Sequence, residues 1–206
     1  MTLIIKKIKE TGRDRLIASA LKLFCDRGYH GVSVREICDC ANANPSLISF
    51  HFGGKEGLLD TLFQSFTPEE FDEIEKILSS VDNAVDLKIR LNLFFKSYVD
   101  FYLKNSEVVS LYFDELEKEH AFAVEILPKT FGKLWNRLVI FLQEAQDKKI
   151  IHSEVDVKIL AYSMISPLGS SMRSKRSTHL FSKFTINDSD FIDRLITQMV
   201  DTIKLA

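Results

Sequence analysis

The residues best suited to metal or redox chemistry are three cysteines near the beginning of the chain, Cys25, Cys38 and Cys40, which His51 follows. A tetrahedral metal site needs four well-placed ligands, and cysteines at positions i and i+2 of a helix point apart. Cys25 and Cys38 also fall on apolar stripes, where a free cysteine packs as a small hydrophobic residue. We therefore expect no metal and no cofactor. An odd number of clustered cysteines favours a reducing, cytoplasmic location over a secreted disulfide framework.

Catalytic chemistry has no candidate arrangement in the sequence. No Ser-His-Asp set, glycine-rich phosphate loop or HExxH motif occurs in the required context, and the five histidines are scattered. The chain is therefore not expected to be an enzyme. It has no run of 18 apolar residues and no signal peptide at its start, so we expect no membrane association.

A helix-turn-helix is the element that would position DNA-binding side chains in the first part of the sequence. Ser33 followed by Glu36 forms a capping box, which predicts a helix over residues 33–41 with one apolar face. Asn42 suits the left-handed conformation that ends such a helix, and a second helix is predicted over residues 44–52. The second helix would lie in the DNA major groove. The spacing alone is equally compatible with a helix pair that has only a structural role and does not bind DNA.

Several residue strings in this region carry a family resemblance. They resemble the DNA-binding domain of the tetracycline-repressor-like (TetR) family of bacterial transcriptional regulators, and they are Leu23-Phe24, Arg27-Gly28-Tyr29, Ser33-Val34-Arg35-Glu36-Ile37 and His51-Phe52-Gly53-Gly54-Lys55-Glu56-Gly57-Leu58. The resemblance implies an all-α fold of about nine to ten helices. A three-helix DNA-binding domain would occupy residues 1–66, and a larger helical effector-binding and dimerisation domain would occupy residues 67–206.

The same resemblance implies which residues contact the DNA operator. Lys55 and His51 would hold backbone phosphates, and Arg35 would reach a base or a phosphate. Free backbone N–H groups near Ser33 and Asn44 also suit a phosphate. The recognition helix is apolar and has few donors, which predicts contacts to thymine methyl groups or DNA shape, and modest sequence discrimination. The candidate DNA-contacting residues are Ser33, Arg35, Asn44, Pro45, Ser46, Leu47, Ser49, Phe50, His51 and Lys55.

Charge is divided unevenly along the chain. The net charge of −2 argues against a protein that coats nucleic acid through bulk charge. Residues 1–66, however, contain nine Lys and Arg against seven Asp and Glu, while residues 67–206 contain 18 against 22. Lys6, Lys7, Lys9 and Arg13 would form either a basic arm along the DNA or a solvated terminus.

The remainder of the chain is predicted to be long helices, at about residues 68–80, 84–104, 107–119, 121–148, 155–171 and 187–205. Pro128 and Pro167 lie inside these patterns and are expected to kink or break the helices. Residues 94–141 hold 11 of the 22 aromatic residues, which favours either an ordinary core or an apolar ligand pocket. The candidate ligand-binding residues are Phe94, Tyr98, Tyr102, Tyr112, Phe113, Phe131 and Trp135.

The last two helices are candidates for self-association. Family members dimerise through the corresponding pair, so the resemblance implies a homodimer, whose two-fold symmetry matches a palindromic operator. The candidate interface residues are Ile159, Tyr162, Phe191, Leu195 and Met199, with a place in the monomer core as the alternative. The expected function is a repressor that a small apolar or aromatic molecule releases from its operator. The alternatives are a DNA-binding regulator controlled by a partner protein and a helical small-molecule carrier without DNA binding.

Overall fold

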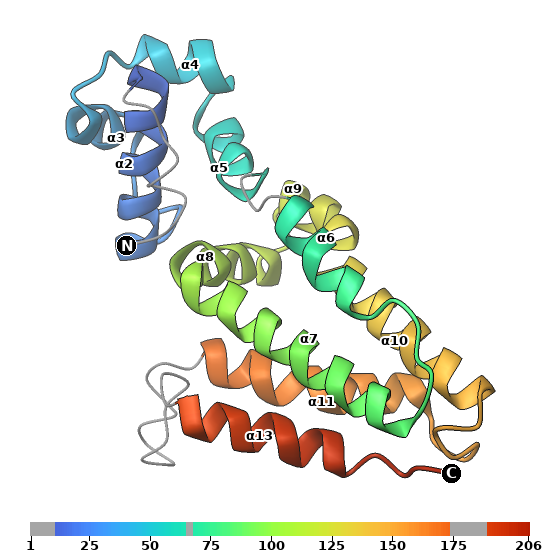
Figure 1. Ribbon diagram of the computed structural model, residues 1–206. Helices are drawn as coiled ribbons and strands as arrows, with labels where there is room; N and C mark the ends of the chain where they lie inside the picture. Colours follow the sequence, from blue (N-terminus) through green and yellow to red (C-terminus); the bar gives the residue numbers. More distant parts are fainter. Residues whose placement is uncertain (1–10, 65–67, 174–188) are drawn as a thin grey trace. The chain divides into compact units, whose positions relative to one another are not determined.

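A computed structural model describes residues 11–64, 68–173 and 189–206 of the chain (Figure 1). Within these ranges the regular elements are helices, apart from one isolated antiparallel bridge between Ile151 and Leu205. The prediction of an all-α fold is confirmed. Lys6, Lys7 and Lys9 of the proposed basic arm lie outside the described residues, whereas Arg13 is the second residue of the helix Gly12–Arg27.

The helices follow the predicted order, with one predicted helix divided in two. They are α2 (Gly12–Arg27), α3 (Val34–Ala41), α4 (Ser46–Phe52), α5 (Lys55–Gln64), α6 (Pro68–Ile77), α7 (Ala84–Lys104), α8 (Ser106–Glu117), α9 (Ala121–Ile126), α10 (Phe131–Asp147), α11 (Val157–Arg173) and α13 (Ser189–Asp201). The predicted helix over residues 121–148 is interrupted by a 3₁₀ turn, Leu127–Lys129, which contains Pro128. Pro167 does not break its helix, because α11 continues through it.

The chain divides into two compact units that do not follow the sequence order. Unit 1 consists of Met1–Thr67 together with Leu103–Leu127, and unit 2 consists of Pro68–Tyr102 together with Pro128–Ala206. The helix-turn-helix region therefore forms one compact body with α8 and α9, two helices that come much later in the sequence.

In unit 1, α2 is the central helix. Leu16, Ala20 and Phe24 are buried at helical spacing, and α2 contacts α3, α4, α5 and α8. Helix α5 also contacts α4, α8 and α9. The rings of Phe63 on α5 and Tyr112 on α8 meet edge to face, with centroids 5.3 Å apart. This apolar contact attaches α8 directly to the helix that follows the recognition helix.

Unit 2 has an aromatic core shared by α6, α7 and α10. The Phe71 ring of α6 lies 4.8 Å from the ring of Phe101 and 5.3 Å from the ring of Phe131. Helix α10 contacts both α6 and α11. Two ion pairs connect α7 and α13: Lys88 with Asp201 at 2.7 Å and Lys96 with Asp193 at 3.0 Å.

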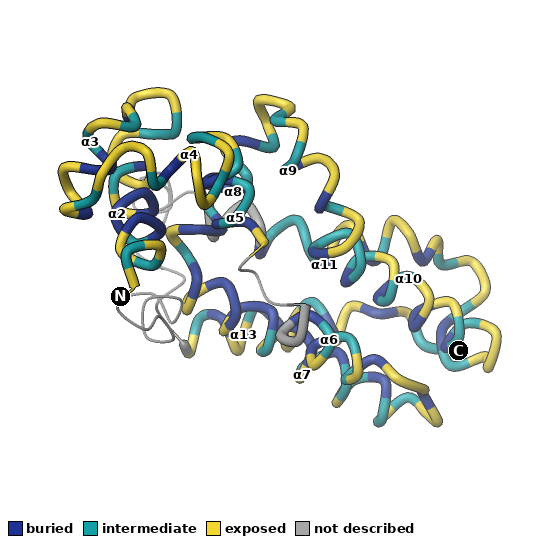
Figure 2. The backbone as a smooth tube through the Cα atoms, turned by 90° about the horizontal axis from the view of Figure 1, so that it is seen from above, coloured by how far each residue is buried: buried dark blue, intermediate teal, exposed yellow. Residues whose placement is uncertain are grey.

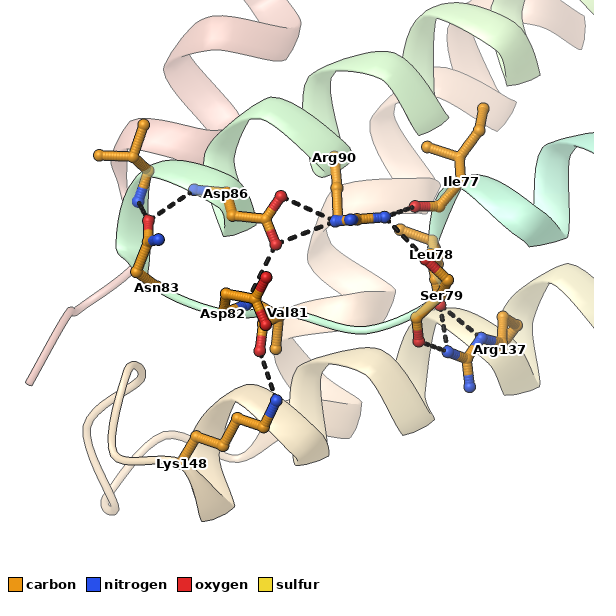
Figure 3. Close-up of polar contacts among 11 residues, drawn as sticks. Ile77, Leu78, Ser79, Val81, Asp82, Asn83, Asp86, Arg90, Arg137 and Lys148 are labelled. Carbon is orange, nitrogen blue, oxygen red and sulfur yellow. Dashed lines mark hydrogen bonds and ion pairs between the residues drawn. The ribbon is translucent and has the colours of Figure 1, made fainter.

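Cationic side chains fix the corner between α6 and α7 (Figure 3). Arg90 of α7, Arg137 of α10 and Lys148, which directly follows α10, donate to backbone carbonyl groups at the end of α6 and in the loop that follows. The last carbonyl groups of a helix have no partner inside the helix and carry partial negative charge, so these cations stabilise the end of α6. The accepting carbonyl groups belong to Ile77, Leu78, Ser79 and Val81.

Candidate nucleic-acid interface

The first helix of the predicted helix-turn-helix begins with the expected capping box. The Ser33 hydroxyl accepts a hydrogen bond from the backbone N–H of Glu36, and the Glu36 carboxylate accepts one from the backbone N–H of Ser33 at 2.7 Å. Arg27, at the end of α2, donates to the same carboxylate at 2.8 Å. These donors, Arg27 first, lower the pKa of Glu36 to about 2. The exposed Ser33 hydroxyl is therefore already engaged with Glu36.

The low pKa of Glu36 makes the stability of unit 1 depend on pH. Because the folded-state pKa lies below the ordinary value of 4.5, the ionised carboxylate stabilises the fold fully above pH 4.5, and this stabilisation is lost as the pH falls through about 2. We expect Glu36→Gln to lower the Tm at pH 7, and this Tm deficit to shrink below pH 4.5. Thermal unfolding between pH 7 and pH 3 measures the deficit. A constant deficit across that range would contradict the ion pair as its cause.

The turn between α3 and α4 has the predicted left-handed residue. Asn42 has φ 48° and ψ 56°, and the backbone N–H of Ala43 donates to the Cys38 carbonyl at 2.9 Å. Arg15 of α2 adds a contact that sequence reasoning missed, because its Nε donates to the Ala41 carbonyl at 3.2 Å. This contact connects the end of α3 to α2 and stabilises the turn that sets the direction of α4.

Helix α4 begins at Ser46, two residues after the start of the predicted range, and Asn44 hydrogen-bonds its first turn. Pro45 precedes the helix, and the Asn44 side-chain oxygen accepts hydrogen bonds from the backbone N–H and the hydroxyl of Ser46, both at 2.9 Å. Asn44 therefore orients the start of the recognition helix. The Ser46 hydroxyl already donates to Asn44, so only its acceptor lone pairs are free for DNA.

One face of α4 is buried and the opposite face is open, as Figure 2 shows for the backbone of α3 and α4. Ile48 is buried, whereas Phe52 is half-buried, with the Arg13 guanidinium 5.3 Å from its ring centroid. Leu47 is half-buried beside Gly12. The side chain of Phe50 is 79% exposed. The remaining exposed candidate residues are Ser33, Arg35, Asn44, Pro45, Ser46, Ser49 and His51.

Lys55 is half-buried, although a side chain that contacts DNA phosphates is expected to be exposed. It is the first residue of α5, and its Nζ lies 4.2 Å from the centroid of the Tyr29 ring and 5.8 Å from that of Phe24. Burial lowers the pKa of Lys55, and the Glu115 carboxylate opposes this effect. The cation–π contact fixes the ammonium next to the end of α4.

The cysteines and the histidines of the described ranges are not arranged as a metal site. Among the described residues, no three His, Cys, Asp or Glu side chains are grouped so that they could hold a metal ion. Cys38 is buried as expected, whereas Cys25 is exposed, so its assignment to the core is wrong. No helix in the described ranges is both long and apolar enough to cross a lipid bilayer.

The aromatic residues suggested as a ligand pocket belong to both units. In unit 2 the Tyr98 ring lies 6.4 Å from that of Phe94 and 6.5 Å from that of Phe131. In unit 1 the buried Tyr112 hydroxyl donates to the Ala123 carbonyl at 3.0 Å, and its ring lies 5.4 Å from that of Phe113. The remaining two candidates are Tyr102, which is buried, and Trp135, which is half-buried.

The candidate dimer residues form two groups. Ile159 and Tyr162, one helical turn apart on α11, are large apolar or aromatic side chains that lie exposed, and Ile159 is 67% exposed. Phe191, Leu195 and Met199 recur every four residues along α13 and are half-buried. Their neighbours Ile192, Ile196 and Val200 form the fully buried stripe of the same helix.

Known proteins share both the motifs and the fold. The profile described as "Bacterial regulatory proteins, tetR family" matches residues 16–62. The chain is 34% identical over 88 residues to YttP of Bacillus subtilis (strain 168), a match that covers 43% of this chain and 42% of YttP. It is 27% identical over 152 residues to the HTH-type transcriptional repressor KstR2 of Mycolicibacterium smegmatis, covering 72% of this chain and 71% of the relative.

A solved structure shows the same fold over nearly the whole chain. The ketosteroid transcriptional regulator KstR2 of Mycobacterium tuberculosis superposes with a TM-score of 0.73 at 20% identity, covering 96% of this chain and 97% of that one. The similarity therefore extends beyond the helix-turn-helix to the later helices. The chain belongs to the TetR family, whose members are DNA-binding transcriptional regulators and not enzymes.

Proposed function

We propose that this chain is a repressor that binds a palindromic operator as a homodimer and that a small apolar or aromatic molecule releases it. The open face of α4 is the observation that carries the DNA-binding part. Phe50 is 79% exposed on a helix whose opposite side is anchored by the buried Ile48. A large aromatic side chain left in water on a recognition helix suits apolar contact with thymine methyl groups.

The DNA contacts in this proposal divide into two kinds. Phe50, Ser49 and Arg35 read bases, because they are exposed on α3 and α4. Lys55 and His51 bind backbone phosphates near the end of α4, and the Tyr29 ring holds Lys55 in place for this contact. In this proposal residues 1–66 bind DNA, and residues 67–206 bind the effector and dimerise.

An apolar effector is supported by the composition of the aromatic cluster and by the relatives. Phe94, Tyr98 and Phe131 supply mainly apolar surface with one hydroxyl group. The KstR2 proteins are named repressors, and the one from Mycobacterium tuberculosis is named a ketosteroid regulator. A ligand that binds the DNA-incompetent conformation more tightly must weaken DNA binding by the same factor by which DNA weakens ligand binding.

Selection of duplexes from a random DNA pool tests the operator. We expect an inverted repeat whose half-sites are related by the dimer axis, rich in A·T pairs and with few fixed guanines. A long motif with several fixed guanines would contradict the role given to Phe50, and no enrichment at all would contradict specific DNA binding. The selected duplex then allows displacement to be measured by fluorescence anisotropy with ketosteroids, aromatic acids and, as a polar control, sugars. Displacement by sugars alone would contradict an apolar effector.

A further inference from the structure

The Tyr29 ring contacts Lys55, the residue given a phosphate contact in the proposed DNA interface. The Lys55 Nζ lies 4.2 Å from the centroid of the Tyr29 ring, within the distance at which a cation is attracted to an aromatic face. Lys55 directly follows Gly53 and Gly54, which end the recognition helix. A lysine side chain has many rotamers, so this contact with the ring restricts where the ammonium lies.

Tyr29 lies in the connection between α2 and α3, where no regular helix fixes its side chain. Three rings meet the Tyr29 ring edge to face. Those of Phe24 and His30 lie 5.3 Å and 5.0 Å away and belong to the same stretch of chain. The third is the ring of His120, which comes from the turn between α8 and α9 and lies 5.9 Å away at an interplanar angle of 79°. His120 therefore supports Tyr29 from a distant part of the sequence.

The backbone of His120 is fixed on both sides. Its N–H donates to the Glu115 carbonyl at 3.0 Å, and its carbonyl accepts from the N–H of Val124 at 3.1 Å, where α9 begins. The buried Tyr112 hydroxyl of α8 donates to the Ala123 carbonyl of α9 at 3.0 Å. Both helices belong to unit 1, and α8 contacts α2 and α5. The turn therefore holds the His120 ring at a defined place beside Tyr29.

The His120 side chain acts on Tyr29 through the surface of its ring. The side chain is only 11% exposed, and neither ring nitrogen has a hydrogen-bond partner among the described residues. Its Nε2 lies 3.9 Å from Oε1 of Glu56 on α5, which is beyond hydrogen-bond distance. Edge-to-face packing of two rings is favourable by itself. The contact with Tyr29 therefore depends on the shape of the His120 ring and not on its nitrogen atoms.

We propose that His120 is a positioning residue of the DNA interface, whose ring keeps Tyr29 in place and, through Tyr29, keeps the Lys55 ammonium in position for a backbone phosphate. A lysine without this support loses more side-chain entropy when it binds the phosphate, so the contact weakens. The phosphate contact rests on the function proposed above, whereas the support of Lys55 by His120 does not. Because His120 belongs to the range 67–206, the DNA interface depends on a residue outside residues 1–66.

The salt dependence of binding to the selected duplex measures the number of phosphate contacts. A plot of the logarithm of the binding constant against the logarithm of the salt concentration has a slope of about −0.9 for each neutralised phosphate. His120→Ala removes the ring, so we expect the slope to become shallower by up to about 0.9 for each protomer, as in Lys55→Gln. His120→Phe replaces the ring and should keep the wild-type slope. Val124→Ala, which truncates an exposed side chain on α9, is the control and should also keep it.

The salt slope separates positioning from a purely structural role. A smaller folded fraction lowers the apparent affinity by the same factor at each salt concentration, so it leaves the slope unchanged. The double variant His120→Ala/Lys55→Gln should match Lys55→Gln, because His120 acts through Lys55. The proposal would be overturned by a wild-type slope in His120→Ala, by a slope in His120→Phe as shallow as that in His120→Ala, or by a further loss in the double variant.

The NMR signal of Lys55 tests its support in the absence of DNA. The ring current of Tyr29 should move the methylene hydrogens next to the Lys55 ammonium upfield of those of an exposed lysine such as Lys22. Isotope-labelled lysine makes these signals visible, and the loss of one signal in Lys55→Arg assigns it. We expect the upfield displacement to shrink in His120→Ala and to persist in His120→Phe.

The two measurements distinguish failure of the support from failure of the proposed DNA contact. Equal displacement of the Lys55 signal in wild type and His120→Ala would overturn the support, even if the chain binds the selected duplex. A displacement that shrinks in His120→Ala would confirm the support. If Lys55→Gln then keeps the wild-type salt slope, the phosphate contact of Lys55 is wrong, and with it the DNA part of this proposal.

Discussion

Replacing Ile159 by lysine is expected to convert the dimer to a monomer and to weaken binding to a two-half-site duplex by about 100-fold to 10,000-fold. Ile159 and Tyr162 expose apolar surface on one face of α11. An ammonium at position 159 would have to lose its water when the second protomer covers this face, which costs free energy. A monomer reaches only one half-site at a time, so it loses the gain from two linked contacts. Analytical ultracentrifugation would detect the change from twice 23.6 kDa to 23.6 kDa, and anisotropy with the selected duplex would measure affinity.

Val85→Lys on α7 is the matched control for this variant. Val85 is 68% exposed, almost the same as Ile159 at 67%, and it also lies on a helix of unit 2. The control receives the same new charge at an equally open position outside the proposed interface. It should keep the dimer mass and the wild-type affinity. A dimeric Ile159→Lys protein, or a monomeric Val85→Lys protein, would contradict the assignment of the interface to α11 and α13.

The local signals of the sequence proved sufficient for the helix-turn-helix. The capping box of Ser33 and Glu36 and the left-handed Asn42 depend on residues within a few positions of one another, and both are confirmed. Local hydrogen bonds from side chains to the backbone, and backbone sterics, act at this range, so residue type alone determines the result. Long-range partners are different. Neither the Arg15 contact with the Ala41 carbonyl nor the Tyr29 contact with Lys55 follows from any periodicity, because each requires the fold to bring the partners together.

Pro128 and Pro167 also show that local sequence signals do not determine what depends on tertiary contacts. Proline removes one backbone donor wherever it lies, so the same kink or break is expected at Pro128 and at Pro167. Pro128 falls in the 3₁₀ turn between α9 and α10, while α11 continues through Pro167. Whether a helix tolerates the lost hydrogen bond depends on the tertiary contacts on either side of it. Inclusion of α8 and α9 in unit 1 is likewise a tertiary result, decided by contacts such as Phe63 with Tyr112.

The same substitution of phenylalanine by alanine should lower folding stability at Phe71 and operator affinity at Phe50. Phe71 is fully buried between the rings of Phe101 and Phe131, so its truncation leaves a cavity in unit 2 and is expected to lower the free energy of unfolding by about 3–5 kcal/mol. Urea unfolding followed by circular dichroism measures this loss. A loss below about 1 kcal/mol would mean that these rings line an open pocket rather than a close-packed core.

Phe50→Ala removes the same atoms from a side chain that is 79% exposed, so the free energy of unfolding should change by less than about 0.5 kcal/mol. Its expected effect is on DNA. A mismatched base pair in a specific site costs about 1–3 kcal/mol, the scale expected for one lost base contact, and a dimer loses the contact at both half-sites. Affinity for the selected duplex should therefore fall at least about tenfold, while affinity for unrelated duplex, which depends on phosphate contacts, should change little. Equal losses on both duplexes would assign Phe50 to general DNA contact, and destabilisation by Phe50→Ala would assign it to the fold.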